Sequence, residues 1–471
     1  MQFNHTAIAA AVSEVQTYSD PKAIYKWSLE FKVLEEGTLD TDDDDLCTGP
    51  REKEGFFSPI FLPNIDFIGD YEKTIGYHVS VACMVAAGMW THVLEPNRNH
   101  LRVYLTRTRV TGLEGDVDME DTPLVFIYKP IFKEDGASYK TVGEAKKISR
   151  KELDMRGMLD LQIDLLPYAL EAVQAAPVGG IWRNVTAMDV LRTNYIGVCS
   201  QFELEGEKLI EHYQIAKDYN TEKLKFIDIK GPTPLMDLHK VLQDNYHGIW
   251  PTGISRFLKD KTWFIFPPYD LKRIEKERRT LSIFLAPQKE AGTSPRSYYI
   301  DGDTLKIVCT GDINVKDTTQ KNFLKHGDGL RFASASNVLE GEWLKLKEGK
   351  ATANRAANYN ELRIKADNYT DHRMQEASRN FSDNTMGNLS ALAGRKGFVV
   401  SLTWNYADHT LIDPGMPVRI FYQDGPELKT LVGNVMFQHA AVQTTQQGIG
   451  QGNYITTSAL MVFCTPEEEV S

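Results

Sequence analysis

The sequence lacks the motifs that mark several widespread enzyme chemistries. Its 471 residues contain no P-loop, no H-E-x-x-H, no G-x-S-x-G and no G-x-G-x-x-G, so the nucleotide, metalloprotease, hydrolase and dinucleotide sites built on those patterns are excluded. Gly448, Gly450 and Gly452 form a G-x-G-x-G run, but no helical pattern follows it. We interpret this run as a flexible hairpin loop before the last strand.

Cysteine is scarce and scattered, which removes a second group of functions. The five cysteines are Cys47, Cys83, Cys199, Cys309 and Cys464, and no two of them form a C-x-x-C pair. Zinc ribbons and thioredoxin-like chemistry are thereby excluded, and a disulfide framework is not expected. We predict small buried thiols in a protein made in a reducing cytoplasm.

Positive charge is outnumbered, with 53 Lys and Arg against 64 Asp and Glu and a net charge of -11. This balance excludes a strongly basic nucleic-acid binder and predicts repulsion from polyanions. The first residues lack the basic start of a signal peptide. Residues 74–94 carry no formal charge, but Gly76, His78 and Gly88 interrupt them, so we expect a bent buried strand and no membrane insertion.

Alternation with period two dominates the chain and predicts strands. Apolar residues alternate with polar ones over 101–106, 159–165, 398–406 and 455–463. The phase slips at Arg107 and Arg109, where we expect a bulge or a strand end. Asp301-Gly302 and Asp424-Gly425 predict tight turns between strands. The length predicts about three domains at about 150 residues each.

Helices are predicted to be few and short. Pro167 opens one that reaches Ala176 and is stopped at the Gly179-Gly180 pair. Thr186 is the expected N-cap of a second, and Thr233 that of a third, which carries an apolar stripe to Gly248. Residues 348–388 are polar and predict an exposed helix or an extended connector.

Other clusters are interpreted as structural, with alternatives left open. The acidic runs at 40–45 and 114–121 are expected to be solvated loops, with calcium binding as the alternative for the first. The basic stretch 272–279 is interpreted as a solvated or inter-subunit face, against a phosphate-binding strip. The aromatic segment 263–269 is expected in the core, with an exposed docking surface as the alternative. His239, His247 and His439 are expected as core or surface residues and not as metal ligands.

Three stretches of the sequence are considered together. They are residues 177–186 (PVGGIWRNVT), 247–270 (HGIWPTGISRF followed by KTWFIFP and YD), and 414–439, which begins PGMPVRI and continues to GNV and His439. The residues singled out in them are Gly179, Gly180, Trp182, Arg183, Asn184, His247, Gly248, Trp250, Gly253, Trp263, Pro414 and Gly415. From the residues themselves, we expect Trp182 as a buried anchor and Arg183 as a fork for a carboxylate or carbonyls.

With these stretches, the chain resembles the baseplate central hub protein of contractile-tailed bacteriophages, a family related to the hub part of type VI secretion spike proteins. The resemblance covers residues 76–464 in patches. It implies a β-rich α+β fold with two tail-tube-type β-barrel domains, small α/β insertions and a C-terminal β-barrel module. The implied division is 1–135 for the first barrel, 136–330 for the second, 331–396 for a polar connector and 397–471 for the last module.

The resemblance also implies a function. Hub proteins are homotrimers whose paired barrels present a pseudo-six-fold ring to the hexameric tail tube, or to a tube-initiator protein, and bind the central spike protein below. The tape measure protein is a further implied partner, and DNA passes through the channel without specific binding. The implied location is the virion tail baseplate, after synthesis in the host cytoplasm. No enzyme activity, cofactor, metal or catalytic residue is implied.

A polyanion moving through the channel predicts acidic or neutral walls, with Asp116, Asp118 and the 42–45 run as candidates. Two alternatives remain open. One is the hub of a type VI or related contractile injection system. The other is a carbohydrate-binding or carbohydrate-active β protein, motivated by the 10% aromatic content and the many acids.

Overall fold

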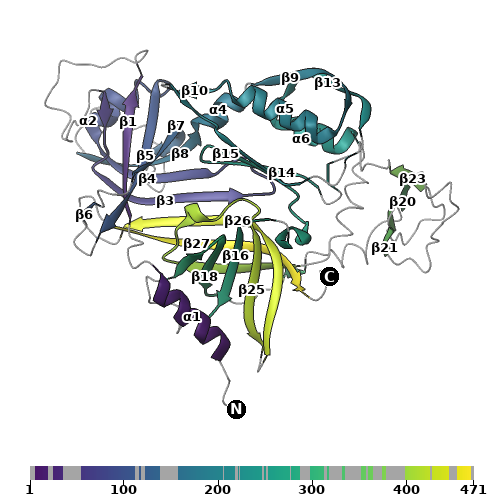
Figure 1. Ribbon diagram of the computed structural model, residues 1–471. Helices are drawn as coiled ribbons and strands as arrows, with labels where there is room; N and C mark the ends of the chain where they lie inside the picture. Colours follow the sequence, from purple (N-terminus) through teal and green to yellow (C-terminus); the bar gives the residue numbers. More distant parts are fainter. Residues whose placement is uncertain are drawn as a thin grey trace, which may run out of the picture.

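The computed structural model shows a β-rich chain of several domains, as the alternation predicts (Figure 1). It describes residues 6–19, 25–34, 55–111, 116–117, 122–137, 157–174, 176–204, 206–217, 221, 223–246, 249–250, 253–275, 277–286, 297–311, 316–317, 331–334, 352–356, 359–363, 374–377, 398–424, 427–444 and 453–467. Statements about what the structure lacks refer to these residues.

The first unit is a ring of eight paired strands. In order around the ring they are β1 (Tyr25–Val33), β5 (Leu101–Thr111), β7 (Leu124–Ala137), β8 (Met158–Pro167), β4 (His78–Ala86), β3 (Phe61–Asp70), β26 (Glu427–Thr444) and β27 (Tyr454–Pro466). Tyr25 pairs with Tyr454, so the order returns from β27 to β1. The short strands β2 (Phe56–Phe57) and β6 (Asp116–Val117) pair with β1 and β5. Alternate side chains of the ring, such as Leu29 and Phe31, form one buried core.

The second unit is a ring of six strands. It runs through β24 (Phe398–Asn405), β27, β26, β25 (Pro417–Asp424), β16 (Thr280–Leu285) and β18 (Thr304–Cys309). Thr310 and Thr403 exchange two backbone hydrogen bonds of 2.8 Å and thereby close the ring from β18 to β24. β17 (Tyr298–Asp301) pairs with β18 across the predicted turn at Gly302, and β19 (Lys316–Asp317) pairs with β24. Helix α1 (Thr6–Tyr18) packs on β16, β17 and β18.

The hairpin of β26 and β27 belongs to both rings. Leu431 and Val435 of β26 lie in the core of the second ring, whereas Ala440 and Val442 lie in the core of the first. Inward positions therefore change from odd to even numbers along one strand. The register shift between Val435 and Phe437 supplies the extra residue that this change needs.

The third unit is an α/β insertion, drawn in teal at the top right of Figure 1. It contains α4 (Tyr168–Gln174), β9 (Pro177–Val185), α5 (Ala187–Cys199), β13 (Leu224–Pro234) and α6 (Leu235–Asn245). Its sheets are β9 with β13, β10 (Glu203–Leu204) with β11 (Glu207–Lys208), and β12 (His212–Ile215) with β15 (Thr262–Phe266) and β14 (Ser255–Lys259). Thr186 and Asp189 form the predicted capping box of α5. The N-cap of α6 is Pro234 and not the predicted Thr233.

The remaining elements are short. A bend of α2 (Ala87–Met89) and the π-helix η1 (Trp90–Leu94) follows β4, and the 3-10 turns are η2 (Leu271–Glu275) and η3 (His409–Leu411). Within the predicted polar connector, the described residues form one sheet of β20 (Arg331–Ser334), β21 (Thr352–Ala356), β22 (Tyr359–Arg363) and β23 (Met374–Ala377) and no helix. None of the described helices is long and apolar enough to cross a membrane.

Two further predictions can be compared with the structure. The four cysteines other than Cys47 are buried free thiols, as expected, and Cys47 lies outside the described residues. The segment boundaries at 135, 330 and 396 stay predictions. Paired strands cross them, because β8 completes the first ring and the β26–β27 hairpin is shared by both rings.

Candidate functional site

The loop between β24 and β25 holds the polar groups at which the units meet. Asp408, at the start of η3, accepts hydrogen bonds from Arg107 Nη1 of β5 at 2.6 Å and from Tyr25 OH of β1 at 2.8 Å. Thr410 Oγ1 donates a third, at 2.6 Å. The Arg107 guanidinium also lies over the Tyr25 ring, 4.3 Å from its centre. One buried carboxylate of the second ring is thus held by two side chains of the first.

Burial and charge set the ionisation of this cluster. Burial alone would raise the pKa of Asp408, but the Arg107 cation and the Thr410 hydroxyl outweigh it and hold that pKa at about 2. Burial and the neighbouring Asp408 charge raise the pKa of Tyr25 above its ordinary value. The pair is therefore a carboxylate and a guanidinium, with a neutral phenol as second donor.

A second cation holds the other end of the same loop. Lys259 of β14, with a side chain only 5% exposed, donates to the carbonyls of Thr410 and Ile412 and to Asp413 Oδ1 at 3.2 Å. Arg279 Nη1 donates to the other oxygen of Asp413 at 2.8 Å. The loop is therefore bound by the first ring at one end and by the α/β insertion at the other.

A polar chain of side chains continues from the loop between the two rings. Gln438 of the shared hairpin is fully buried, and its Oε1 accepts from Tyr71 OH and Tyr77 OH, each at 2.8 Å. Its Nε2 donates to the carbonyl of His409 and to Ser458 Oγ. Every bond of this amide is made within the protein, so the junction is satisfied without an outside ligand.

His409 is buried among aromatic rings of the first core. Its ring stacks on Phe67 at 4.5 Å between centres and on Trp27 at 6.0 Å. Burial, with the Arg107 cation in second place, lowers the pKa of His409 to about 3. The imidazole is therefore neutral in the folded protein at any physiological pH.

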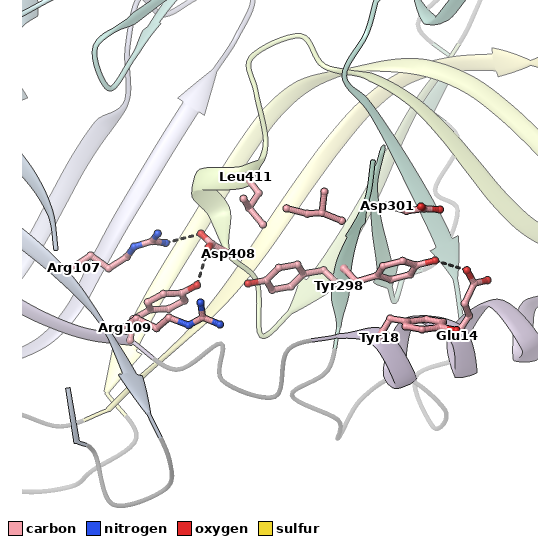
Figure 2. Close-up of a pocket in the computed structure, with 11 residues that line it drawn as sticks. Glu14, Tyr18, Arg107, Arg109, Tyr298, Asp301, Asp408 and Leu411 are labelled. Carbon is pink, nitrogen blue, oxygen red and sulfur yellow. Dashed lines mark hydrogen bonds and ion pairs between the residues drawn. The ribbon is translucent and has the colours of Figure 1, made fainter. Parts of the chain in front are cut away.

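An open cavity of about 800 Å³ lies beside this cluster (Figure 2). It lies between the first ring, β17 and α1, and Figure 2 shows Arg107 and Asp408 at one end and Glu14 with Tyr18 at the other. It is lined by Glu14, Tyr18, Tyr25, Arg107, Arg109, Tyr298, Tyr299, Ile300, Asp301, Asp408 and Leu411.

Four charged groups of the cavity form ion pairs, and Glu14 and Asp301 form theirs with Lys306, which does not line the cavity. Arg107 pairs with Asp408, while Glu14 pairs with Lys306 and accepts from Tyr299. Among the described residues no cluster of His, Cys, Asp and Glu could hold a metal ion. The Arg107–Asp408 pair beside this cavity connects the first ring to the second.

The predicted glycines and tryptophans hold backbones close together. Gly179 and Gly180 lie inside β9 and not at a helix end, and a Cβ on Gly179 would lie 2.9 Å from Gly231 Cα of β13. Asn184 has a φ of 55° and lies near the end of the same strand. Trp182 is half-buried against the core of the α/β insertion, and not fully buried as expected.

For Arg183, Trp250 and Trp263, the structure can be compared with the environment that the sequence predicts for each side chain. Arg183 is exposed over the Phe226 ring at 5.6 Å and finds no carboxylate there. Trp250 is buried and donates from Nε1 to the Lys217 carbonyl at 2.9 Å. Trp263 is buried against Tyr195, which confirms core packing for the aromatic segment.

Gly253 and Gly415 both have a positive φ, of 95° and 66°. At Gly415 a side chain would also lie 2.2 Å from Phe266. Pro414 precedes it in the loop bound by Lys259, and His247 and Gly248 lie outside the described residues.

The structure explains the basic stretch 272–279 and the break in alternation at Arg107. Arg273 donates to the Gly415 carbonyl at 2.9 Å, and Arg279 to Asp413, so these two arginines hold the loop and are not a free face. β5 continues through Arg107 without the expected bulge or end, because Arg107 pairs in register with Trp27. The alternation breaks at Arg107 because this arginine binds the buried Asp408. The acids at 40–45 lie outside the described residues.

A scan against protein-family models and a search of curated proteins find no match. Among solved structures, the tail protein from Neisseria meningitidis MC58 is similar, with a TM-score of 0.42, 12% identity, and 93% of this chain and 96% of that chain covered. The 43 kDa tail protein of prophage MuSo2 from Shewanella oneidensis gives 0.41, 8%, 92% and 96%. A chain of the Francisella PdpA–VgrG complex gives 0.42, 9% and 93%, and this chain spans 58% of its length. The similar structures are thus of the kinds that the sequence resemblance names.

We expect Asp408→Ala to destabilise the protein by about 3–5 kcal/mol, because it leaves the buried Arg107 charge without its partner. Chemical denaturation followed by tryptophan fluorescence measures the change. Arg278→Ala is the control, since it breaks the exposed Arg278–Asp303 pair, and its unfolding midpoint should match the wild type. Equal midpoints for Asp408→Ala and the wild type would contradict the assigned role.

We expect stability to fall with pH below about 6.5, because unfolded His409 takes up a proton there while the folded ring stays neutral down to about 3. His409→Phe, which keeps the stacking, should reduce this slope by up to about 1.4 kcal/mol per pH unit. The slope is measured by denaturation between about pH 6 and 4.5, above the range in which Asp408 titrates. His239, whose pKa is also lowered by burial, keeps a slope of its own in both proteins. An unchanged slope would contradict this prediction.

Proposed function

We propose that the chain is a structural virion protein of a contractile tail, a homotrimeric baseplate hub that joins the hexameric tail tube to the trimeric central spike. The observation that carries the proposal is that one chain contains two closed rings of strands side by side, sharing the β26–β27 hairpin. On this proposal each ring is a tube-type barrel. Three chains then present six barrels to a six-fold partner, which adapts one symmetry to the other.

The interactions within the junction support this role. The rings are held together by a shared hairpin, a buried ion pair and a satisfied amide, so their relative placement is fixed before any partner binds. A fixed spacing of two barrels is what a six-fold tube requires from a trimer. An enzyme would need an activated side chain at an open site, and the described cavity offers none.

We propose that one group of neighbouring strands, β8, β4, β3, β26, β27 and β24, forms the wall of the DNA channel, and we call this group the belt. β8, β4, β3, β27 and β24 contain no Lys or Arg, and in β26 the one cation is Lys429, near its start. These strands are neighbours across both rings. Asp66, Asp160 and Asp164 alternate with the inward residues of their strands and face outward. β1 and β5, on another side of the first ring, carry Lys26, Lys32 and Arg102 in addition to Arg107 and Arg109.

This belt is a second candidate wall beside the acids that the sequence predicts for the channel. Asp118 and the 42–45 run lie outside the described residues, and Asp116 lies in β6, beside β5. A wall without cations cannot hold phosphates by ion pairing, so DNA would pass without a bound state. The tape measure protein would occupy the same channel before DNA.

A density map of intact particles tests the function. We expect three copies of this chain on the tail axis, between tube and spike, with the β8–β24 belt toward the lumen. A map of a contractile injection particle without DNA would favour the type VI alternative. Copies placed away from the axis would contradict the proposal, as would a lumen lined by β1 and β5.

Phages carrying Gln162→Lys, on the exposed side of β8, should release DNA several-fold more slowly, because the new cation binds passing phosphates. Release is followed by fluorescence of a DNA-binding dye after triggering. Thr106→Lys, on β5, is the matched control and should leave the rate unchanged. Equal rates for the two variants, in particles with normal tails, would show that β8 does not face the channel.

A further inference from the structure

The β9–β13 ribbon forms the outer layer of the α/β insertion. Its two strands pair over Leu224–Val185 to Ile229–Gly180, and neither has another described partner. Figure 1 shows the ribbon outside α5 and α6, away from both rings. Ile227 and Ile229 point inward and are buried in the core shared with these helices. The inner face is thus occupied, and the outer face is open.

The outer face carries a row of apolar side chains. Phe226 is 59% exposed and Ile181 is 65% exposed. They are diagonal neighbours, because Phe226 pairs with Arg183 and Asp228 pairs with Ile181. Val185 and Leu224 pair next along the ribbon, but both are half-buried and pack against the core of the insertion, so the exposed apolar row consists of Phe226 and Ile181. An apolar row of this kind on a two-stranded sheet, which is marginal by itself, is typical of a contact surface.

The charge around this row has the opposite sign to that of the chain. Within the described residues of 177–185 and 223–234, Arg183, Lys223, Lys225 and Lys230 are exposed and Asp228 is the one acid. Residues 177–185 and 223–234 therefore carry four positive charges and one negative charge, whereas the whole chain has a net charge of -11. A basic rim around an apolar centre selects an acidic protein surface.

We propose that the outer face of the β9–β13 ribbon is the docking surface for a second copy of this chain, which meets it with a different and acidic surface. The inference rests on the proposed homotrimer and names the surface that builds it. Two ribbons facing each other would bring two basic patches together, so a two-fold dimer through this face is disfavoured. Contact between unlike surfaces is heterologous, and a heterologous contact that closes gives a cyclic ring.

The shape of the patch favours protein over nucleic acid. Its centre consists of the exposed side chains of Ile181 and Phe226; Arg183 lies over the Phe226 ring, and the other cations lie on or beside the two strands. An apolar centre gains from exclusion of water by another apolar surface, and a phosphate backbone does not provide one. DNA binding is therefore the outcome that the experiment must distinguish.

The test compares oligomeric state across matched variants by light scattering and sedimentation of the full chain. We expect the wild type to form trimers whose half-assembly concentration rises with salt, because screening weakens the charged rim. Phe226→Asp and Ile181→Asp should each raise that concentration roughly tenfold or more. Ile196→Asp is the control: Ile196 is 45% exposed on α5, in the same unit, and its variant should assemble like the wild type.

Charge reversal gives an independent variant. Lys225→Glu combined with Lys230→Glu leaves the apolar row intact and should weaken assembly at low salt, with a difference that shrinks at high salt. All the altered side chains are exposed, and equal circular dichroism melting curves of the monomers establish that each variant folds.

Each contrary result has its own meaning. Trimers that persist in the Phe226→Asp, Ile181→Asp double variant would overturn the ribbon as the interface and leave the hub function standing. A wild type that stays monomeric up to about 100 µM, or that forms a two-fold dimer, would overturn the homotrimer itself. Binding of a duplex DNA fragment that is lost in Phe226→Asp would reassign the ribbon to nucleic acid.

Discussion

The shared β26–β27 hairpin is the constraint on which the rest of the molecule depends. Each of its strands contributes to two cores, so neither ring can close without the other's strands in place. One extra residue before Phe437 lets a single strand present odd positions to one core and even positions to the next. The relative position of the two rings is therefore fixed by covalent continuity and by hydrogen bonds along the strands, and not by a separable interface.

Because the two strands of the hairpin contribute to two cores, polar groups are buried where the rings and the insertion meet, and these groups need partners. Asp408 and Asp413 find theirs in Arg107 of the first ring, Lys259 of the α/β insertion, and Arg279, which lies just before β16 of the second ring itself. Buried ion pairs add little net stability compared with well-packed apolar groups, because desolvation offsets their attraction. We expect their effect to be on specificity, because an arrangement that separates the rings or the insertion would leave these buried charges without partners. On the proposed function, a fixed geometry at this junction matters more to an adaptor between symmetries than additional stability does.

The sequence predicted local structure well where one interaction decides it. The alternating strands, the turn at Gly302 and the capping box at Thr186 were all predictable, because period, turn chemistry and a side-chain cap act within a few residues. The sharing of the hairpin was not predictable, since pairing over hundreds of residues leaves no local trace. Arg107 lies between these cases. The sequence shows that Arg107 occupies a position at which the alternation calls for an apolar residue. A bulge or strand end was the wrong explanation, because the residue that Arg107 binds, Asp408, is 301 residues away.

The distribution of charge carries more meaning than its sum. A net charge of -11 excludes a basic polyanion binder, yet the described strands differ in charge: β8, β4, β3, β27 and β24 contain no Lys or Arg, whereas the β9–β13 ribbon, with Lys223 beside it, carries four cations and one acid. On the proposed function, these five strands, which are joined through β26, would face a polyanion, and the basic ribbon of the insertion would attract another copy of an acidic chain. On these proposals, the same excess of acidic groups that would repel DNA from the belt would attract a second copy of the chain to the ribbon. Separate surfaces of opposite character are what a ring of identical subunits around DNA requires, because each subunit must bind its neighbours while releasing what passes between them.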